Sequence, residues 1–173
     1  METSIPAIID IEASGFGRES YPIEVGVVFA NGEKFCRLIK PEASWTHWDP
    51  KAESVHRISR EILETKGLPA SQVAQELNER LSDMTIYSDC WTVDKPWLDT
   101  LFLVTNTAPT FRVRAIEMVL DEDQWERWRE TFSSNIKKHV GIRHRASADA
   151  ELIQKTWIGT RTSSNNAQRK KAG

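Results

Sequence analysis

The stretch IIDIEASG, residues 8–15, decides how this chain folds and what chemistry it can carry. It belongs to an apolar run, residues 5–11, that is rich in isoleucine and predicts a buried strand. Residues 14–17, SGFG, then break the strand with serine and glycine. Asp10 and Glu12 therefore lie at the end of a strand that is otherwise apolar.

Ionised carboxylates are rarely buried unless they are paired or bind a metal ion. Asp10 and Glu12 are two residues apart, so on a strand both side chains point to the same face. Two carboxylates side by side repel each other, and a divalent cation such as Mg²⁺ or Mn²⁺ would remove that cost. Acids are common at strand ends, so the pair alone favours an exposed strand end with two solvated acids.

The rest of the chain predicts one α/β domain with a mixed sheet. A second strand over residues 22–30 and a third over 34–39 flank Asn31-Gly32, a strong hairpin signal, so they should pair antiparallel. Short strands are expected at residues 84–87 and 111–113. Helices are expected to begin at Asp49-Pro50 and at Ser59, and to cover residues 69–82, 94–104, 114–139 (as one or two helices) and 146–157.

Composition sets the class of protein. The chain has 173 residues, 39% of them hydrophobic and 28% charged, which is typical of one globular domain. The net charge of −2 means that any binding of nucleic acid would depend on a local patch or on bound metal. Cys36 and Cys90 cannot form a zinc site alone, and we expect both to be reduced. Neither a secretory signal nor a run of about 20 apolar residues is found, so no membrane partner and a cytoplasmic location are expected.

Two motifs near the ends of the chain resemble those of a known family. Residues 10–15 fit D-x-E-x-[ST]-G, and residues 144–150 fit H-x-A-x-x-D-A. Together they resemble the DnaQ-like exonucleases, which hydrolyse nucleic acid from its 3′ end. The gap of five residues between His144 and Asp149 resembles the histidine, or DEDDh, subclass. The resemblance implies a ribonuclease H-like fold, with a mixed five-stranded sheet whose first three strands are antiparallel, flanked by helices.

Two further segments resemble the family, and a third does so less well. Residues 22–26 match its pattern P-I-E-x-G, and residues 55–59 match V-H-G-I-[ST], except that Arg57 replaces the glycine. The third segment is the family's middle motif, often written H-N-x-x-F-D. Asp94 aligns best with its aspartate because Trp97-Leu98 follows it, but Asp89-Cys90 stands where the pattern has His-Asn. Asp89 therefore remains a rival ligand, or a residue that caps the following helix.

The resemblance implies a two-metal mechanism. One divalent cation, Mg²⁺ or Mn²⁺, would be held by Asp10, Glu12 and Asp149, and the other mainly by Asp10 with help from Asp94. His144 is implied as the general base, and nucleoside 5′-monophosphates as the products.

Residues 1–159 would form the exonuclease domain, and residues 160–173 a flexible tail that contains basic residues and no acid. The implied substrate is the 3′ end of single-stranded RNA or DNA, contacted by Ser14, Gly15, Phe16 and His56. The resemblance leaves open a homodimer, and also a module of the same fold that is catalytically silent or bound to a polymerase.

Overall fold

The computed structural model describes residues 4–139 and 143–171, with side chains described as far as Arg161. Five strands form one mixed sheet in the order β3-β2-β1-β4-β5. β1 pairs antiparallel with β2, and β2 with β3, whereas β4 runs parallel to β1 and to β5. This confirms the expected sheet. The strands are β1 (Ile8–Ala13), β2 (Pro22–Val28), β3 (Lys34–Leu38), β4 (Thr85–Ser88) and β5 (Arg112–Ala115).

The first strand differs from its prediction at both ends. β1 begins at Ile8 instead of Ile5, and it continues through Glu12 to Ala13. Asp10 and Glu12 thus lie within the strand, each paired with a residue of β2. The Asn31-Gly32 hairpin is confirmed. The amide of Gly32 donates to the carbonyl of Phe29 at 2.9 Å, and Gly32 takes the positive φ of 84° that glycine adopts without strain.

Side chains of Asp49, Ser59 and Asp121 cap the helices that follow them, which is why α1, α2 and α5 begin there. The predicted helical stretch 114–139 divides into the end of β5, the short 3₁₀ helix η1 and α5. α4 begins at Trp91, ahead of the expected Asp94. The helices are α1 (Pro50–His56), α2 (Arg60–Lys66), α3 (Ala70–Leu81), α4 (Trp91–Val104), η1 (Ile116–Val119), α5 (Glu122–Lys138) and α6 (Ala146–Lys171).

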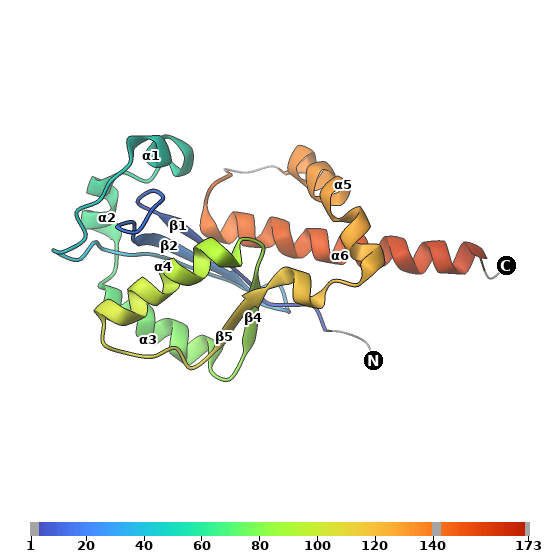
Figure 1. The fold of residues 1–173 in the computed structure, drawn as a ribbon, viewed down its shortest axis with the longest axis horizontal. Helices are drawn as coiled ribbons and strands as arrows, with labels where there is room; N and C mark the ends of the chain where they lie inside the picture. Colours follow the sequence, from blue (N-terminus) through green and yellow to red (C-terminus); the bar gives the residue numbers. More distant parts are fainter. Residues whose placement is uncertain (1–3, 140–142, 172–173) are drawn as a thin grey trace.

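The last helix is longer than predicted, since α6 runs past Trp157 to Lys171. Figure 1 shows its second half extending beyond the sheet toward the C-terminus. The backbone shows no break at the predicted boundary between residues 159 and 160. The side chains of the predicted basic tail, from residue 162, lie outside the described part.

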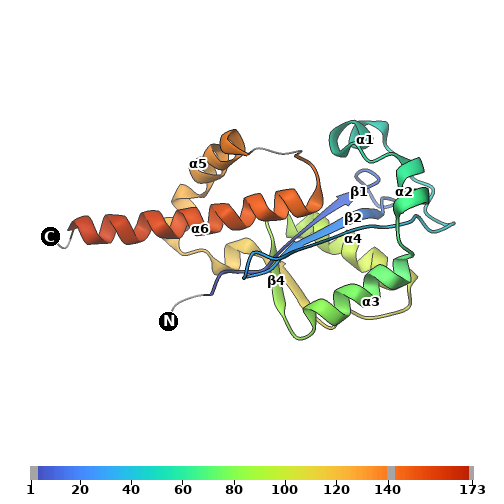
Figure 2. The ribbon, with the colours of Figure 1, turned by 180° about the vertical axis from the view of Figure 1, so that it is seen from behind.

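The sheet separates two apolar layers, and Figures 1 and 2 show α4 and α6 on its opposite sides. Ile9 and Ile11 of β1 pack with the core cluster that includes α3 and α4, while Ile8 packs with Trp157 of α6. Because side chains alternate along a strand, Asp10 and Glu12 share the α6 side with Ile8. No helix in the described ranges is long and apolar enough to cross a membrane.

The start of α6 sits unusually close to β2. Ala146, Ala150 and Ile153 are buried on the side of α6 that faces the sheet, with Trp157 one turn further on. A Cβ on Gly26 of β2 would lie 2.1 Å from the backbone nitrogen of Ser147, so only glycine permits this approach. The G of the P-I-E-x-G pattern thus docks the helix that carries Asp149.

Candidate metal centre

The acids predicted at opposite ends of the sequence converge at one end of the sheet. Asp10 and Glu12 lie on the α6 side of the central strand β1. Asp89 directly follows β4, which runs parallel to β1, and Asp94 lies in the first turns of α4. Asp149 lies in the first turn of α6. The ends of parallel strands and the starts of the helices that follow them are the usual place for a ligand site in such sheets.

These side chains form two groups. Ligand atoms of Glu12, His144 and Asp149 all lie within 4.8 Å of one another, and so do ligand atoms of Asp10, Asp89 and Asp94. Ligands of a Mg²⁺ ion at about 2.1 Å stand roughly 3–4 Å apart, so each group could close on one ion with small shifts. Carboxylate oxygens with one imidazole suit Mg²⁺ or Mn²⁺. The residues present therefore fit two such cations. Their grouping differs from the one that the resemblance implied, because Asp10 lies with Asp89 and Asp94 and not with Glu12 and Asp149.

Asp94 is the most deeply buried of these acids, with 3% of its surface exposed. The hydroxyl of Ser88, at the end of β4, donates a short hydrogen bond to Oδ2 of Asp94. Burial nevertheless raises the pKa of Asp94 to about 7, and the nearby charge of Asp89 adds to the rise. The hydrogen bond fixes the direction of the carboxylate, while the raised pKa shows that its negative charge is not fully compensated.

The pKa values of the two acids of β1 are raised in the same way. Burial raises the pKa of Glu12 to about 7, with Asp149 as the largest contributing charge. Burial, followed by the charge of Asp94, raises the pKa of Asp10 well above its usual range. Such shifts arise where carboxylates are gathered without a cation among them.

The loop before α6 orients Asp149. The amide of His144 donates to Oδ2 of Asp149 at 3.0 Å, and Nε of Arg143 donates to Oδ1 at 2.9 Å. His144 takes a positive φ of 60°, which is uncommon for a residue with a side chain. Its imidazole is 45% exposed, with Nδ1 3.9 Å from Oδ2 of Asp149. It therefore stands at the rim of the Glu12 group, open to solvent.

An ion pair that the sequence reasoning missed fixes this loop to the sheet. The carboxylate of Glu24 on β2 is fully buried and accepts hydrogen bonds from Nε of Arg145 at 3.0 and 3.1 Å. It also accepts one from the backbone amide of Ala146, at the start of α6, at 2.8 Å. Glu24 and Gly26 are two apart on β2 and share the face toward α6. Glu24 and Gly26, the E and the G of P-I-E-x-G, therefore hold the start of α6, and the charge of Glu24 also helps to raise the pKa of Glu12.

The four predicted substrate-binding residues divide into two buried side chains, a glycine and one exposed ring. Ser14 is buried, and its hydroxyl is hydrogen-bonded to Nδ1 of His47 at 3.1 Å. His56 is 2% exposed, and its Nδ1 accepts from the amide of Ile58 at 3.1 Å. A Cβ on Gly15 would lie 2.7 Å from side-chain atoms of Asp49 and His47, so this turn needs glycine.

Phe16, by contrast, is 74% exposed. Its ring packs at a tilt against Trp97, with 5.9 Å between the centroids. Of the four residues, Phe16 is the one whose side chain is presented to solvent beside the site. Their roles in substrate binding stay predictions.

Asp89 does not cap α4, which was one of the two roles left open for it. The N-cap of α4 is Cys90, which makes no capping hydrogen bond with its side chain. The hydroxyl of Ser88 accepts from the amide of Cys90 instead. The carboxylate of Asp89 is turned toward Asp10 and Asp94. Burial raises its pKa to about 6, and the charge of Asp149 adds to that rise.

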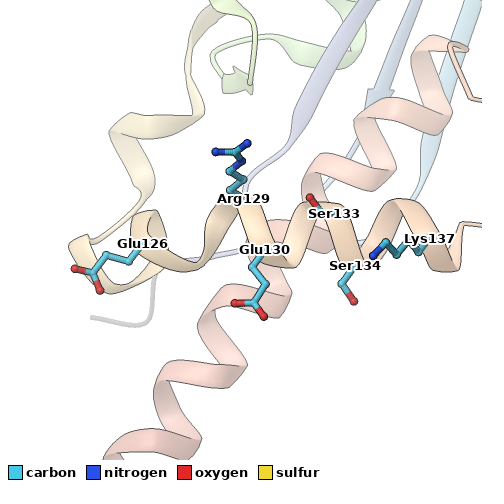
Figure 3. Close-up of a pocket in the computed structure, with 6 residues that line it drawn as sticks. All are labelled: Glu126, Arg129, Glu130, Ser133, Ser134 and Lys137. Atoms are coloured by element: carbon cyan, nitrogen blue, oxygen red, sulfur yellow. The ribbon is translucent and has the colours of Figure 1, made fainter.

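A hollow of about 600 Å³ lies away from these acids, along the exposed side of α5. Figure 3 shows that its lining residues all come from that single helix. It lacks the convergence of polar groups from several elements that marks the carboxylate site. The lining residues are Glu126, Arg129, Glu130, Ser133, Ser134 and Lys137.

Comparison with solved structures defines the class of this fold. Exonuclease I of E. coli in complex with a dA16 oligonucleotide superposes with a TM-score of 0.67 at 15% identity, over 94% of this chain and 42% of that one. A zinc-bound form of the E. coli ExoI–ssDNA complex gives 0.66 at 13% identity, over 92% and 40%. Exonuclease I from Methylocaldum szegediense gives 0.67 at 12% identity, over 88% and 39%.

The chain therefore has the ribonuclease H-like fold of the DnaQ-like exonucleases, as its motifs predicted. It spans about 40% of the length of these exonuclease I chains. No protein-family sequence model and no curated protein sequence matches it.

Proposed function

We propose that this chain is a metal-dependent 3′–5′ exonuclease that releases nucleoside 5′-monophosphates from single-stranded RNA or DNA. The observation that carries the proposal is the pair of ligand groups at one end of the sheet, Glu12 with His144 and Asp149, and Asp10 with Asp94 and Asp89. Two divalent cations, Mg²⁺ or Mn²⁺, would stabilise charge on the attacking and the leaving oxygen of a phosphodiester.

The residues of the chain have distinct parts in this reaction. Asp10, Glu12, Asp94 and Asp149 hold the cations. His144, half-exposed beside Glu12 and Asp149, accepts a proton from the attacking water, since imidazoles exchange protons near neutral pH. Ser88 keeps the carboxylate of Asp94 fixed.

Substrate binding would begin at the turn after β1. Phe16 offers an exposed aromatic face against which a terminal base can stack. Ser14 and Gly15 shape that turn. Single-stranded DNA is the ligand of the exonuclease I structures that share the fold, which supports a single-stranded substrate here. The cytoplasmic location and the homodimer stay predictions.

The test is a cleavage assay on matched single-stranded RNA and DNA oligomers, labelled at the 5′ end, and on a circular strand, with Mg²⁺ or Mn²⁺. We expect a ladder that shortens from the 3′ end, intact circles, and no activity in Asp10→Asn. Cleavage of circles would identify an endonuclease. Binding without cleavage by the unmodified chain would identify a catalytically silent module of the same fold.

A further inference from the structure

The family resemblance assigns no role to Asp89, although this acid lies among the candidate metal ligands. Asp89 stands where the family pattern has His-Asn, and its carboxylate faces Asp10 and Asp94. We propose that Asp89 is a fifth carboxylate ligand, which binds the cation shared by Asp10 and Asp94 directly. This inference rests on the proposed function, because it concerns the same site.

The first argument is the geometry of the three acids. Asp10, Asp89 and Asp94 each offer an oxygen, and all three oxygens lie within 4.8 Å of one another. The backbone fixes all three positions. Asp10 is in the central strand, Asp89 directly follows β4, and Asp94 is in the first turns of α4. Three oxygens from three elements that converge on one point form one face of an octahedral site.

Asp94, the neighbouring acid, already has a hydrogen-bond partner in Ser88. Oδ2 of Asp94 already accepts the hydroxyl of Ser88, and Asp94 is 3% exposed, so it sits at the back of the group. Asp89 is more exposed and is not engaged as a cap of α4. We infer that Asp89 contributes a direct ligand and that Asp94, fixed by Ser88, completes the site from behind.

Asp89 also lies among other negative charges. Asp89 lies in the field of Asp149 as well as in contact with the Asp10 group, so it stands between the two groups of acids. None of the ion pairs found among the described side chains includes Asp89. The charge of Arg143 offsets this field in part, but Arg143 is hydrogen-bonded to Asp149. A carboxylate held among these acids costs free energy that a divalent cation would recover.

If Asp89 is a metal ligand, its negative charge also affects how strand binding depends on metal. With five carboxylates at the site, the unloaded protein repels the phosphates of a nucleic acid strand, and two divalent cations would offset four of those five negative charges. Strand binding should therefore require divalent metal, and replacing Asp89 by a neutral residue should relax that requirement while weakening metal binding.

The experiment measures Mn²⁺ binding at pH 8 by calorimetry and by the EPR signal of free Mn²⁺. The unmodified chain, Asp89→Asn and Asp89→Ser are compared. The matched control is Asp83→Asn, which makes the same chemical change at an exposed position ahead of β4. Loss of a group that only supports a metal ligand costs about 10- to 100-fold in affinity. We expect two binding steps in the unmodified chain and in Asp83→Asn, and one step weakened by more than about 100-fold in both Asp89 variants. A loss of about 10- to 100-fold would make Asp89 a supporting group and would overturn its direct role.

The outcomes separate this inference from the proposed function. Two unchanged binding steps in both Asp89 variants would overturn the role of Asp89 and leave the four-acid site standing. An unmodified chain that binds no Mn²⁺ would overturn both. Binding of a fluorescent single strand with and without Mn²⁺ gives a second measurement. Asp89→Asn should retain more metal-free strand binding than Asp83→Asn, and equal retention would contradict the charge argument.

Discussion

At the scale of single residues, His144 is the side chain whose proposed part in the reaction can be separated most clearly from metal binding. It lies within ligand distance of Glu12 and Asp149, yet its ring is 45% exposed at the edge of the site. A positioned general base contributes about 10²–10⁴-fold in rate. We therefore expect His144→Ala to reduce turnover by roughly that factor while Mn²⁺ affinity stays nearly unchanged, as measured by single-turnover cleavage and calorimetry.

The variant Asp149→Asn is the comparison for this prediction, because it is expected to lose metal binding as well as activity. If Mn²⁺ affinity falls in His144→Ala as far as in Asp149→Asn, then His144 is a ligand and another group accepts the proton.

Phe16 permits a second residue-scale test, on the substrate instead of the metal. Stacking of a base on an aromatic ring is worth about 1–3 kcal/mol, so Phe16→Ala should weaken single-strand binding by roughly 5- to 150-fold. Binding is measured by fluorescence anisotropy with Ca²⁺ or with an inactive Asp10→Asn background. Leu103→Ala is the matched control, because Leu103 is 82% exposed on α4. Equal affinities in both variants would mean that Phe16 does not contact the strand.

The sequence was sufficient to predict that Asp10, Glu12, Asp149 and His144 lie at one end of the sheet, because strand alternation and motif spacing fix where such residues lie. Their roles stay predictions. It was not sufficient for Asp89. The direction of a side chain just after a strand depends on the turn that follows it. Here the turn uses Ser88 to bind the amide of Cys90, and this leaves the carboxylate of Asp89 free to face Asp10.

At the scale of elements, the docking of α6 on β2 determines whether the two halves of the site meet. Gly26 allows the backbone of α6 to approach, since a Cβ there would lie 2.1 Å from the nitrogen of Ser147. Overpacking a tight contact typically costs about 1–3 kcal/mol. We expect Gly26→Ala to lower the free energy of unfolding by that amount, measured by urea denaturation, and to reduce activity because Asp149 moves away from Glu12.

Gly159→Ala is the control for this change, because it lies in the helix α6 itself. A Cβ there would meet a methyl group of Thr131 at 3.0 Å, and alanine favours a helix over glycine by roughly 1 kcal/mol. We expect its stability to be equal or higher. A Gly26→Ala protein as stable and active as the unmodified chain would show that α6 is not held by this contact.

Elements were predicted better than the contacts between them. Apolar periodicity, the Asn31-Gly32 turn and the capping residues gave nearly all strands and helices within a few residues. The ion pair between Glu24 and Arg145 joins residues 121 positions apart, and no local pattern contains it. The length of α6 was missed for a related reason, because its polar second half has no apolar stripe from which to read a helix.

At the scale of the whole molecule, the gathered acids make stability depend on pH and on metal together. Burial raises the pKa of Glu12 and of Asp94 to about 7 and that of Asp89 to about 6. A carboxyl whose pKa is higher in the folded state stabilises the fold when protonated, and that contribution is lost as the pH rises through the folded value. Without metal, the melting temperature should therefore fall between pH 5 and pH 8.

Divalent metal should reverse this trend. At a Mn²⁺ concentration of about 100 times Kd, binding adds roughly 2.7 kcal/mol to the free energy of unfolding. For a chain of this size that corresponds to about 5–10 °C in Tm. The measurement is a set of thermal melts at pH 5, 6, 7 and 8 with EDTA or Mn²⁺, with Glu12→Gln as a variant that should flatten the pH dependence. A metal-free protein that is most stable at pH 8 would contradict the expected sign.

β1 has a further property that follows from its place in the middle of the sheet. Because Asp10 and Glu12 are two residues apart on one strand, the repeat of an extended backbone, roughly 6.5–7 Å, sets the separation of their Cα atoms. The strand thus sets the distance between Asp10 and Glu12, which belong to different groups of candidate ligands. Insertion or deletion of a single residue between these acids would turn one carboxylate to the opposite face of the sheet, into the layer formed by α3 and α4. The spacing of Asp10 and Glu12 is thus protected from changes in the packing around β1, and is sensitive to changes in the length of the strand.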